Sequence, residues 1–360
     1  MRVFAVIMAG GVGSRFWPKS REATPKQFQH VFGDRTLYQR TYDRISEIVT
    51  PENTFVVTNK VQREAASMQL PQLPPENIIV EPFGRNTAPC IAVAASAISS
   101  ITEDAVMVVL PSDHLISQEE NFVAQLKDAV RLADKERALV TLGIRPTHPE
   151  TGFGYIHFDR HTEKKEIVSH AGYNVIELKE KPDMETAVAF LKSGDYLWNS
   201  GMFIWRVDII LDELRRNLTH FSDFHSPLKS SFGNEDFSKQ LEEFYLRVES
   251  ISVDYAVMEK AKNVLTIPSS FTWSDVGSWD EVYKLGDRNN EGNSIKGAVI
   301  GIRSLNNLIW AEEKLIALVG VEDLIVVETK DAVLICKRGE SQGVKEIVEI
   351  LRKQDRQDFV

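Results

Sequence analysis

The sequence is poor in cysteine and has no long apolar run. Its 360 residues include two cysteines, Cys90 and Cys336, too few for a disulfide framework or a four-ligand zinc site. This cysteine use favours a reducing, cytoplasmic compartment. No stretch approaches the roughly 18 apolar residues of a membrane-spanning helix, so we expect no membrane segment. The short apolar run that begins at residue 3 lacks a typical cleavage site, so we discount a signal peptide.

Basic residues are outnumbered by acidic ones. The chain has 42 Lys and Arg against 52 Asp and Glu, a net charge of −10. This balance argues against a nucleic-acid-binding protein, which usually presents a basic face, although a local cationic pocket would still bind an anionic small molecule. Hydrophobic residues make up 43% of the chain, which is enough for a sizeable core and excludes intrinsic disorder.

The first half of the chain alternates strand and helix patterns. Short apolar runs that end in Gly, Pro or Asn predict buried strands at residues 3–8, 54–58, 77–80, 105–110 and 138–143. Helical patterns lie at residues 36–49, 61–69, 88–99 and 121–134. This alternation predicts a doubly wound, mostly parallel α/β sheet, whose ligand would lie beyond the carboxyl ends of the strands.

The composition changes near residue 285. Residues 150–285 mix strand and helix patterns without a linker, so we assign residues 1–285 to one domain. Residues 286–293 are polar and rich in turn formers, which indicates a boundary. Beyond it, short β-rich runs recur at intervals of about 8–10 residues, as in all-β modules, and residues 342–353 are predicted to be helical. We therefore assign residues 286–360 to a second, small domain.

A glycine-rich loop follows the first predicted strand, with Gly10, Gly11 and Gly13 ahead of Ser14 and Arg15. Glycines let the backbone turn sharply and approach a ligand closely, and successive backbone N–H groups form an anion-binding nest. Arg15 adds a guanidinium for bidentate phosphate contact. From residue 10 to residue 26, four cationic side chains stand against one carboxylate. In an acidic chain, this local excess favours a phosphate-binding loop.

Two familiar phosphate-binding patterns do not fit this loop. A Walker A loop needs Gly-Lys-Ser/Thr, which is absent, and Phe16 stands where the dinucleotide fingerprint has its third glycine. A plain glycine turn with incidental surface charge is the alternative interpretation.

Two aspartates are candidate metal ligands. Asp113 follows the most apolar predicted strand, directly after Ser112, and Asp275 lies in a later Trp-Ser-Asp-Val-Gly motif. Carboxylates at the carboxyl end of a central strand suit Mg²⁺, which is usually held by one or two of them together with substrate phosphates. The alternative is that both aspartates cap helices or turns.

Further polar motifs lie in loops after strands. Glu180 and Lys181 form a Glu-Lys-Pro motif, Asn199 lies in Trp-Asn-Ser-Gly, and Gly154 lies in Gly-Phe-Gly-Tyr. Each motif also has a purely structural interpretation. The Glu-Lys pair would be a solvated ion pair, the Trp-Asn-Ser-Gly motif part of an amphipathic strand, and the Gly-Phe-Gly-Tyr motif an ordinary turn. The sequence Arg-Asn-Thr-Ala-Pro at residues 85–89 also has one, because Thr87 would serve as a helix N-cap.

Together, the motifs resemble a known family. The pattern Gly10-Gly11-x-Gly13-x-Arg15-x-x-Pro18, followed by Pro25-Lys26-Gln27-Phe28, is similar to the signature of sugar-1-phosphate nucleotidyltransferases. The Phe16-Trp17-Pro18 variant resembles the mannose-1-phosphate guanylyltransferases among them. The ordered motifs cover roughly residues 3–285. Two positions differ from the family pattern: Lys19-Ser20 stands where Leu-Ser is usual, and Leu178 stands where a Phe is usual. We expect neither difference to change the phosphate-binding loop or the reaction.

The resemblance implies a reaction and a set of roles. A mannose-1-phosphate guanylyltransferase joins GTP and α-D-mannose 1-phosphate, giving GDP-mannose and diphosphate. Asp113 and Asp275 would hold Mg²⁺, Arg15 and Lys26 the triphosphate, and Lys181 the sugar phosphate. The nucleotide would be bound by Gly10, Gly11, Gly13, Ser14, Arg15, Arg85, Asn86, Thr87 and Ser112. The mannose would be bound by Gly154, Glu180 and Asn199.

The resemblance also implies the architecture and leaves alternatives open. We expect a Rossmann-like catalytic domain, a short C-terminal β-helix-like module without an isomerase domain, and a homodimer. Physics alone does not separate guanine from another base, or mannose from another hexose. A non-catalytic nucleotide-sugar-binding subunit is disfavoured by the five charged candidates, and a redox Rossmann protein is disfavoured by the missing glycine.

Overall fold

The computed structural model describes residues 1–161, 165–166 and 168–360, and these fall into two compact units. The first unit comprises residues 1–10, 41–112 and 116–273, and the second comprises residues 11–40, 113–115 and 274–360. This grouping differs from the domain division predicted at residue 285, because Phe16, Trp17 and Val31 are buried with Trp279 and Trp310 in the second unit. The division of the sequence into domains at residues 1–285 and 286–360 stays a prediction.

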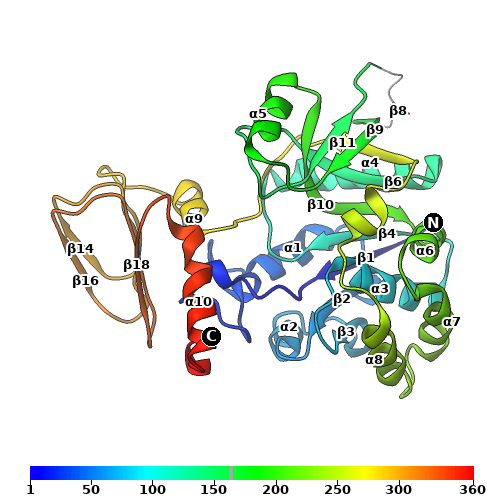
Figure 1. The fold of residues 1–360 in the computed structure, drawn as a ribbon, viewed down its shortest axis with the longest axis horizontal. Helices are drawn as coiled ribbons and strands as arrows, with labels where there is room; N and C mark the ends of the chain where they lie inside the picture. The colour runs from blue at the N-terminus through cyan, green and yellow to red at the C-terminus, as the bar shows by residue number, and fades with distance from the viewer. Residues whose placement is uncertain (162–164, 167) are drawn as a thin grey trace. The chain divides into compact units, whose positions relative to one another are not determined.

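A ten-stranded sheet forms the centre of the first unit, in the order β3-β2-β1-β4-β10-β6-β11-β9-β7 with β8 beside β9 (Figure 1). Its strands are β1 (Arg2–Met8), β2 (Thr54–Asn59), β3 (Ile78–Glu81), β4 (Ala105–Pro111), β6 (Leu139–Ile144), β7 (Tyr155–Phe158), β8 (Lys165–Glu166), β9 (Ala171–Lys179), β10 (Tyr196–Arg206) and β11 (Val264–Pro268). The strands β3, β2, β1 and β4 run parallel, which confirms the predicted doubly wound α/β class.

The rest of the sheet is more mixed than the strand–helix alternation predicts. β10 lies between β4 and β6 and runs antiparallel to both, and β9 runs antiparallel to β7 and β11. The short strands β5 (Leu115–Ser117) and β12 (Thr272–Ser274) lie outside this sheet.

Helices flank the large sheet. They are α1 (Leu37–Ile45), α2 (Arg63–Gln69), α3 (Thr87–Ile101), α4 (Glu119–Glu136), α5 (Met184–Ser193), α6 (Val207–Asn217), α7 (Phe221–Ser231) and α8 (Phe237–Arg247). The predicted helices of the first half are confirmed, whereas α6, α7 and β11 were not predicted. α3 is buried along residues 88–99, since its many alanines allow close packing in the core. Within the residues described, no helix is long and apolar enough to cross a membrane.

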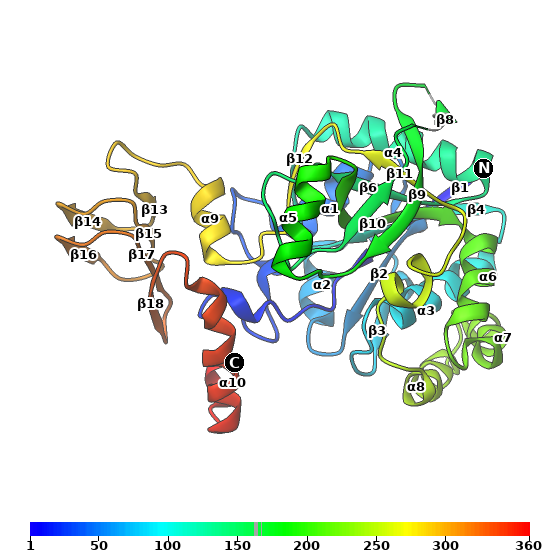
Figure 2. The same cartoon turned by 45° about the horizontal axis from the view of Figure 1, so that its top comes forward.

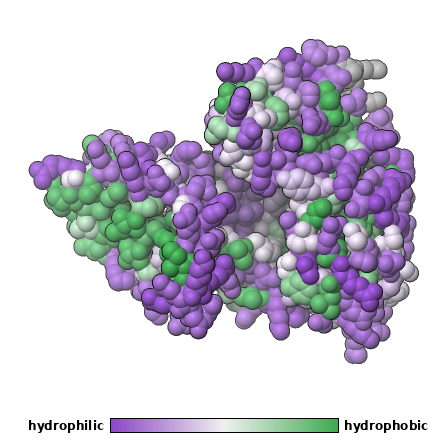
Figure 3. All heavy atoms as spheres, in the orientation of Figure 1, coloured by the Kyte–Doolittle hydropathy of each residue, from purple (hydrophilic) through white to green (hydrophobic). Residues whose placement is uncertain are grey.

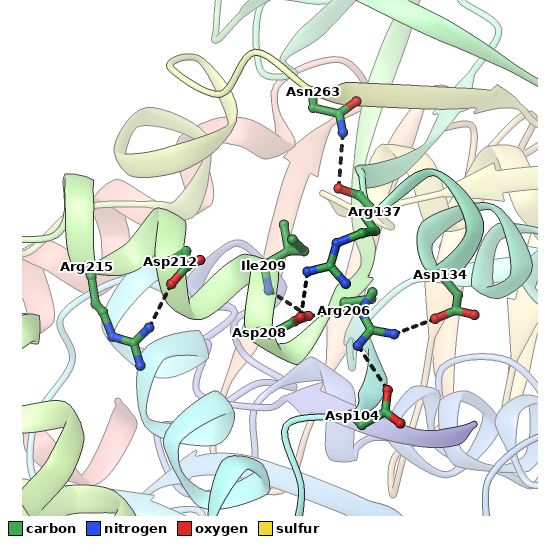
Figure 4. A network of polar contacts seen from close by, with 9 residues as sticks. All are labelled: Asp104, Asp134, Arg137, Arg206, Asp208, Ile209, Asp212, Arg215 and Asn263. Carbon is green, nitrogen blue, oxygen red and sulfur yellow. Dashed lines mark hydrogen bonds and ion pairs between the residues drawn. The ribbon is translucent and has the colours of Figure 1, made fainter.

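A charged network fixes the junction of β10 and α6 (Figure 4). The Arg206 guanidinium lies 3.0 Å from Asp104, 2.6 Å from Asp134 and 3.0 Å from Asp208. Burial lowers the pKa of Arg206, but these carboxylates more than offset it and hold that pKa above its usual value. Asp208 also accepts the backbone N–H of Ile209 at the start of α6. The network therefore anchors one end of β10, the strand that carries the candidate residue Asn199.

Short strands, all but the last one paired in parallel, stack in the C-terminal part of the second unit (Figure 2). They are β13 (Ser294–Lys296), β14 (Val299–Ile302), β15 (Leu308–Trp310), β16 (Ile316–Val319), β17 (Leu324–Glu328) and β18 (Val333–Lys337), with helices α9 (Trp279–Leu285) and α10 (Val344–Lys353). Parallel pairing of β13, β15 and β17, and of β14 and β16, stacks successive turns of the chain. This confirms the predicted short β-helix-like module that ends in a helix.

Buried asparagines join the turns of this module. Both N–H groups of Asn307, backbone and side chain, donate to the Asn293 carboxamide oxygen at 2.8 and 3.0 Å. The Asn307 oxygen in turn accepts the backbone N–H of Leu324 at 2.8 Å, and the Asn293 side chain donates to the Ser304 carbonyl at 2.8 Å. Because Asn307 is fully buried, these bonds supply partners to backbone groups that water does not reach.

We expect Asn307→Ala to destabilise the protein by about 1–3 kcal/mol, because it removes the acceptor of the partly buried Leu324 N–H and one of the two donors to the Asn293 oxygen. The melting temperature of the variant, followed by circular dichroism, measures this loss. Asn290→Ala, at an exposed position, is the matched control and should unfold like the parent protein. Equal melting temperatures for both variants would show that the hydrogen bonds of the Asn307 side chain contribute nothing to stability.

Candidate active site

Candidate nucleotide-binding residues lie at the carboxyl ends of the parallel strands of the first unit. Gly10 follows β1 and Ser112 follows β4, and the backbone N–H of Ser112 donates to the Met8 carbonyl at 3.1 Å. Asn59, the last residue of β2, donates its side-chain N–H to the Gly10 carbonyl at 3.3 Å. This edge is where doubly wound sheets bind ligands, so the fold places Gly10 and Ser112 as predicted.

The loop before α3 carries Arg85, Asn86 and Thr87. Asn86 is the N-cap of α3, with φ of 68° and a side chain that accepts the Thr87 N–H at 2.9 Å. The expectation that Thr87 caps the helix is therefore wrong by one residue; its hydroxyl accepts the Val253 N–H at 2.9 Å instead. Arg85 lies over the Phe83 ring, 5.0 Å from its centroid. Helix capping thus accounts for Asn86, whereas Arg85 presents a cation beside an aromatic ring.

A lysine and two aspartates meet in the second unit. The Lys26 ammonium lies 3.0 Å from the Asp113 carboxylate and donates to the carbonyls of Asp275 and Val276 at 2.5 and 2.9 Å. Burial raises the pKa of Asp113, but the charges of Lys26 and His114 outweigh it and hold that pKa below its usual value. Lys26 is buried. The structure therefore brings three predicted residues together around one ammonium group.

The glycine-rich loop of the second unit is held against the segment of Lys26. Gly13 has φ of 57°, and a Cβ there would lie 3.2 Å from the backbone nitrogen of Lys26. A side chain at this position would therefore be both strained and crowded. Gln27 donates to the Gly11 carbonyl at 2.9 Å. Ser14 and Arg15 form the 3-10 helix η1 (Ser14–Phe16), and Arg15 is exposed. The backbone of this loop is fixed while the Arg15 guanidinium extends into solvent.

The backbone beside Asp275 is strained. Val276 has φ of 47°, a conformation that β-branched residues avoid, and it is fully buried in the core of the second unit. Such strain persists only where the surroundings enforce it, and it concentrates at functional sites. Here, core packing of Val276 and its carbonyl's bond to Lys26 enforce it, which fixes the position of Asp275.

The predicted sugar-binding residues meet in the first unit. Lys181 follows β9, and its ammonium lies 2.6 Å from the Glu180 carboxylate. Asn199 in β10 donates its backbone N–H to the Gly154 carbonyl at 2.8 Å. A Cβ on Gly154 would lie 2.3 Å from the Glu180 carboxylate and 3.3 Å from the Asn199 Cβ. Glu180, Lys181, Asn199 and Gly154 therefore form one cluster, as the resemblance implies.

Asp254 belongs to the same cluster, and sequence reasoning missed it. The Asn199 side chain donates to its carboxylate at 2.7 Å. Burial and the neighbouring Glu180 charge raise the pKa of Asp254 to about 6. Asp254 begins the π-helical segment η5 (Asp254–Met258), a rare conformation that is frequent at functional sites. The cluster thus combines an ammonium group, two carboxyl groups and a carboxamide.

We expect Gly154→Ala to raise KM for the sugar substrate about tenfold, because the new methyl group displaces the Glu180 carboxylate from its position. Initial rates at varied concentrations of each substrate would show the change on the sugar side alone. Gly152→Ala is the matched control, since a Cβ there meets no atom closer than 3.2 Å. An unchanged KM would remove Gly154 and Glu180 from the sugar site.

The chemistry of the donor set suits a magnesium ion. Over the described residues, no three His, Cys, Asp or Glu side chains gather as a metal site. The Asp113 carboxylate lies beside Lys26, which also bonds to the main-chain carbonyl of Asp275; the two aspartate side chains are oxygen donors of the kind that Mg²⁺ takes when phosphate oxygens complete its coordination. These two aspartates therefore fit the predicted role.

Comparison with known proteins defines the class. A model of the nucleotidyl transferase family matches residues 4–291, and a model of the mannose-phosphate isomerase/GMP-like β-helix domain matches residues 297–351. The chain is thus a nucleotidyltransferase with a C-terminal β-helix domain.

Individual relatives narrow the class. Mannose-1-phosphate guanylyltransferases of Escherichia coli K12 and Salmonella montevideo are 41% and 39% identical over 99% of this chain, which covers 75% of each. A Thermus thermophilus structure, described as a mannose-1-phosphate geranyltransferase, superposes with a TM-score of 0.86 at 31% identity, over 98% of this chain and 100% of that one. The chain belongs to the mannose-1-phosphate guanylyltransferase family.

Proposed function

We propose that this chain transfers GMP from GTP to α-D-mannose 1-phosphate, giving GDP-mannose and diphosphate, with Mg²⁺ as its metal. The observation that carries the proposal is the cluster of Glu180, Lys181, Asn199 and Asp254. It sets an ammonium group for a phosphate beside carboxyl and carboxamide groups for sugar hydroxyls. The named activity of relatives about 40% identical over nearly the whole chain supports it.

In this reaction, a phosphate oxygen of mannose 1-phosphate attacks the α-phosphorus of GTP in line. The bond from that phosphorus to the bridging oxygen breaks, and diphosphate leaves with the electron pair. Both reactants are anions, so catalysis depends on positioning and on neutralising charge. Bound Mg²⁺ supplies positive charge at the phosphates. No covalent intermediate on the protein is required.

Each predicted residue then has a distinct task. Lys26 and Arg15 bind phosphates of GTP, and Lys26 also fixes the backbone of Asp275. Asp113 and Asp275 hold the metal. Lys181 orients the attacking phosphate, while Glu180, Asn199 and Asp254 accept or donate hydrogen bonds at the mannose hydroxyls. The glycine-rich loop and residues 85–87 with Ser112 contact the nucleotide.

Release of diphosphate tests the function directly. The purified chain is supplied with Mg²⁺ and mannose 1-phosphate, and with GTP, ATP, UTP or dTTP in separate reactions. We expect strong release with GTP alone. Release with another nucleotide instead would keep the reaction class and overturn the base assignment. No release with any of the four would overturn the proposed activity.

An apolar face of the β-helix module supports the expected homodimer (Figure 3). Ile302 and Val319 are paired across β14 and β16, and they are 53% and 59% exposed; Ile300 on the same face is 55% exposed. Monomers seldom expose a contiguous apolar patch of this kind, so we propose that a second copy covers it. Light scattering should give twice the chain mass, and Ile302→Asp should give monomers. A parent protein that elutes as a monomer would overturn the proposal.

Two further expectations complete the proposal. The two cysteines are free thiols, which fits a reducing cytoplasmic location. We also expect the chain to lack mannose-6-phosphate isomerase activity. Robust isomerisation by the pure protein would overturn that expectation.

A further inference from the structure

The segment between Arg15 and Lys26 has no task in the mechanism above. Arg15 is exposed, and across the described residues no hydrogen bond or ion pair holds its guanidinium group. A long side chain without such a partner takes its position from the backbone that carries it. The place of the Arg15 charge therefore depends on what holds the backbone after it.

Three ion pairs join residues 19–22 to the C-terminal part of the second unit. They are Lys19–Glu312, Arg21–Asp331 and Glu22–Arg352, the second and third at 2.8 and 2.7 Å. The partners follow β15, follow β17 and lie in α10, respectively. Three separate elements thus hold four consecutive residues, and we call these three pairs the clamp.

Two tryptophans hold the start of the same segment. The Trp17 side chain donates to the Phe359 carbonyl at 2.8 Å, and the Trp17 carbonyl accepts the side-chain N–H of Trp279 at 3.1 Å. The Phe16 ring packs against the Trp279 ring, with 5.1 Å between their centroids. α10 packs against η1 (Figure 1). The two residues that follow Arg15 are therefore fixed by the C-terminal part of the chain.

The partners in the β-helix module are themselves held in place. Glu328, whose side chain is 2% exposed, accepts the backbone N–H groups of residues 312–314 at 2.8, 3.0 and 3.2 Å. These bonds fix the turn that carries the partner of Lys19. Asp331 accepts the Thr329 hydroxyl at 3.0 Å. Because these carboxylates lie on ordered turns, their ion pairs lose less conformational entropy than ion pairs between two mobile side chains do.

The effect of the clamp lies in position more than in stability. One exposed ion pair contributes little to the free energy of unfolding. Here, however, the pairs resist a displacement of the backbone beside a guanidinium that acts on phosphates. In an active site, misplacement of a group by about 1 Å costs up to about 10²-fold in rate. Weak contacts at this place therefore have a measurable effect on nucleotide binding.

We propose that the β-helix module and α10 position Arg15 for the phosphates of GTP, through the clamp and the bonds of Trp17. This inference rests on the proposed function, because Arg15 acts on the triphosphate of that same reaction. The clamp residues are positioning residues, since they act through Arg15. The β-helix module thereby takes part in nucleotide binding, in addition to presenting an apolar face to a second copy.

The test reverses two pairs of the clamp and keeps the net charge of the chain. In Asp331→Lys/Arg352→Glu, Arg21 and Glu22 each meet a like charge. We expect Kd for GTP, measured by calorimetry with Mg²⁺, and KM for GTP to rise about three- to tenfold. KM for mannose 1-phosphate should stay unchanged, because the sugar cluster lies in the first unit. Glu349→Lys/Lys353→Glu, at two exposed positions of α10, is the matched control and should equal the parent protein.

Removal of Arg15 separates positioning from plain structural support. In the Arg15→Ala background, the reversed pairs should change Kd for GTP no further, because the side chain through which they act is absent. An equal rise in both backgrounds would overturn the proposal. Arg352→Glu alone should weaken GTP binding in part, and adding Glu22→Arg should recover the affinity. A loss that this restored pair leaves in full would overturn the proposal too.

Hydrogen exchange separates this inference from the proposed function. Mass spectrometry of the ligand-free protein reports the exchange of backbone amides in residues 14–22, without nucleotide or turnover. We expect faster exchange there in Asp331→Lys/Arg352→Glu than in the parent protein. Unchanged exchange, or an unchanged Kd for GTP, would overturn the inference and leave the proposed function intact. A parent protein that binds no GTP would overturn the proposed function, while the exchange rates would still show whether the clamp holds the loop.

A milder variant keeps the test decisive if the double variant fails to fold. Glu312→Gln removes one pair and introduces no repulsion. We expect it to raise Kd for GTP about twofold and to speed amide exchange in residues 14–22. A parent-like Kd together with parent-like exchange would overturn the inference.

Discussion

Asp275→Asn should lower kcat by at least about tenfold at saturating Mg²⁺, and by about 10²- to 10³-fold if its carboxylate is the metal ligand that we propose. The substitution keeps the shape of the side chain and removes one charge. Lys26 bonds to the Asp275 and Val276 carbonyls, and these main-chain contacts do not depend on the carboxylate. The loss therefore reports on the metal and the phosphates rather than on the local fold.

Titration with Mg²⁺ provides the measurement. The variant should need a higher Mg²⁺ concentration for half-maximal diphosphate release, in addition to its lower plateau. Asp287→Asn, an exposed aspartate in the same unit, carries the same change of charge and should match the parent protein. Turnover close to that of the parent protein would refute the metal role of Asp275.

The place of Gly10 and Ser112 in the fold was largely predictable from the sequence. Gly10 and Ser112 each follow a strand of the parallel region, so the rule for doubly wound sheets places both at one edge. The direction of β10 was not predictable, because it follows from pairing with β4 and β6 and not from the local sequence. Yet this antiparallel strand is what brings Asn199 to Gly154.

One residue with a strong candidate role, Asp254, was not predicted as a site residue. Residues 254–260 have a helical pattern, which predicts a structural segment and gives no sign of the π-helical conformation or of a site role for Asp254. Its partner, Asn199, is 55 residues away in sequence, so only the folded chain shows the pair.

Lys181→Ala is the second substitution for which we expect a large effect, because the Lys181 ammonium group lies among the carboxyl groups of the predicted sugar-binding cluster. Burial lowers the pKa of Lys181, but the Glu180 and Asp254 carboxyl groups outweigh it and hold that pKa above its usual value, so the side chain is a cation at neutral pH. We expect kcat/KM for mannose 1-phosphate to fall about 10²- to 10³-fold, with KM for GTP nearly unchanged. Lys179→Ala, two residues earlier and exposed, is the matched control. A loss confined to GTP use would show that Lys181 does not bind the sugar phosphate.

A double variant separates lost attraction from new repulsion. Without Lys181, the Glu180 and Asp254 carboxyl groups lose the cation that lies beside them and repel an incoming phosphate. Part of the loss in Lys181→Ala is then repulsion, and Glu180→Gln in the same chain should recover some affinity for mannose 1-phosphate. The two single variants would then combine non-additively, because their side chains lie 2.6 Å apart. Strict additivity of the two losses would instead mean that the ammonium group and the carboxylate act on the sugar phosphate independently.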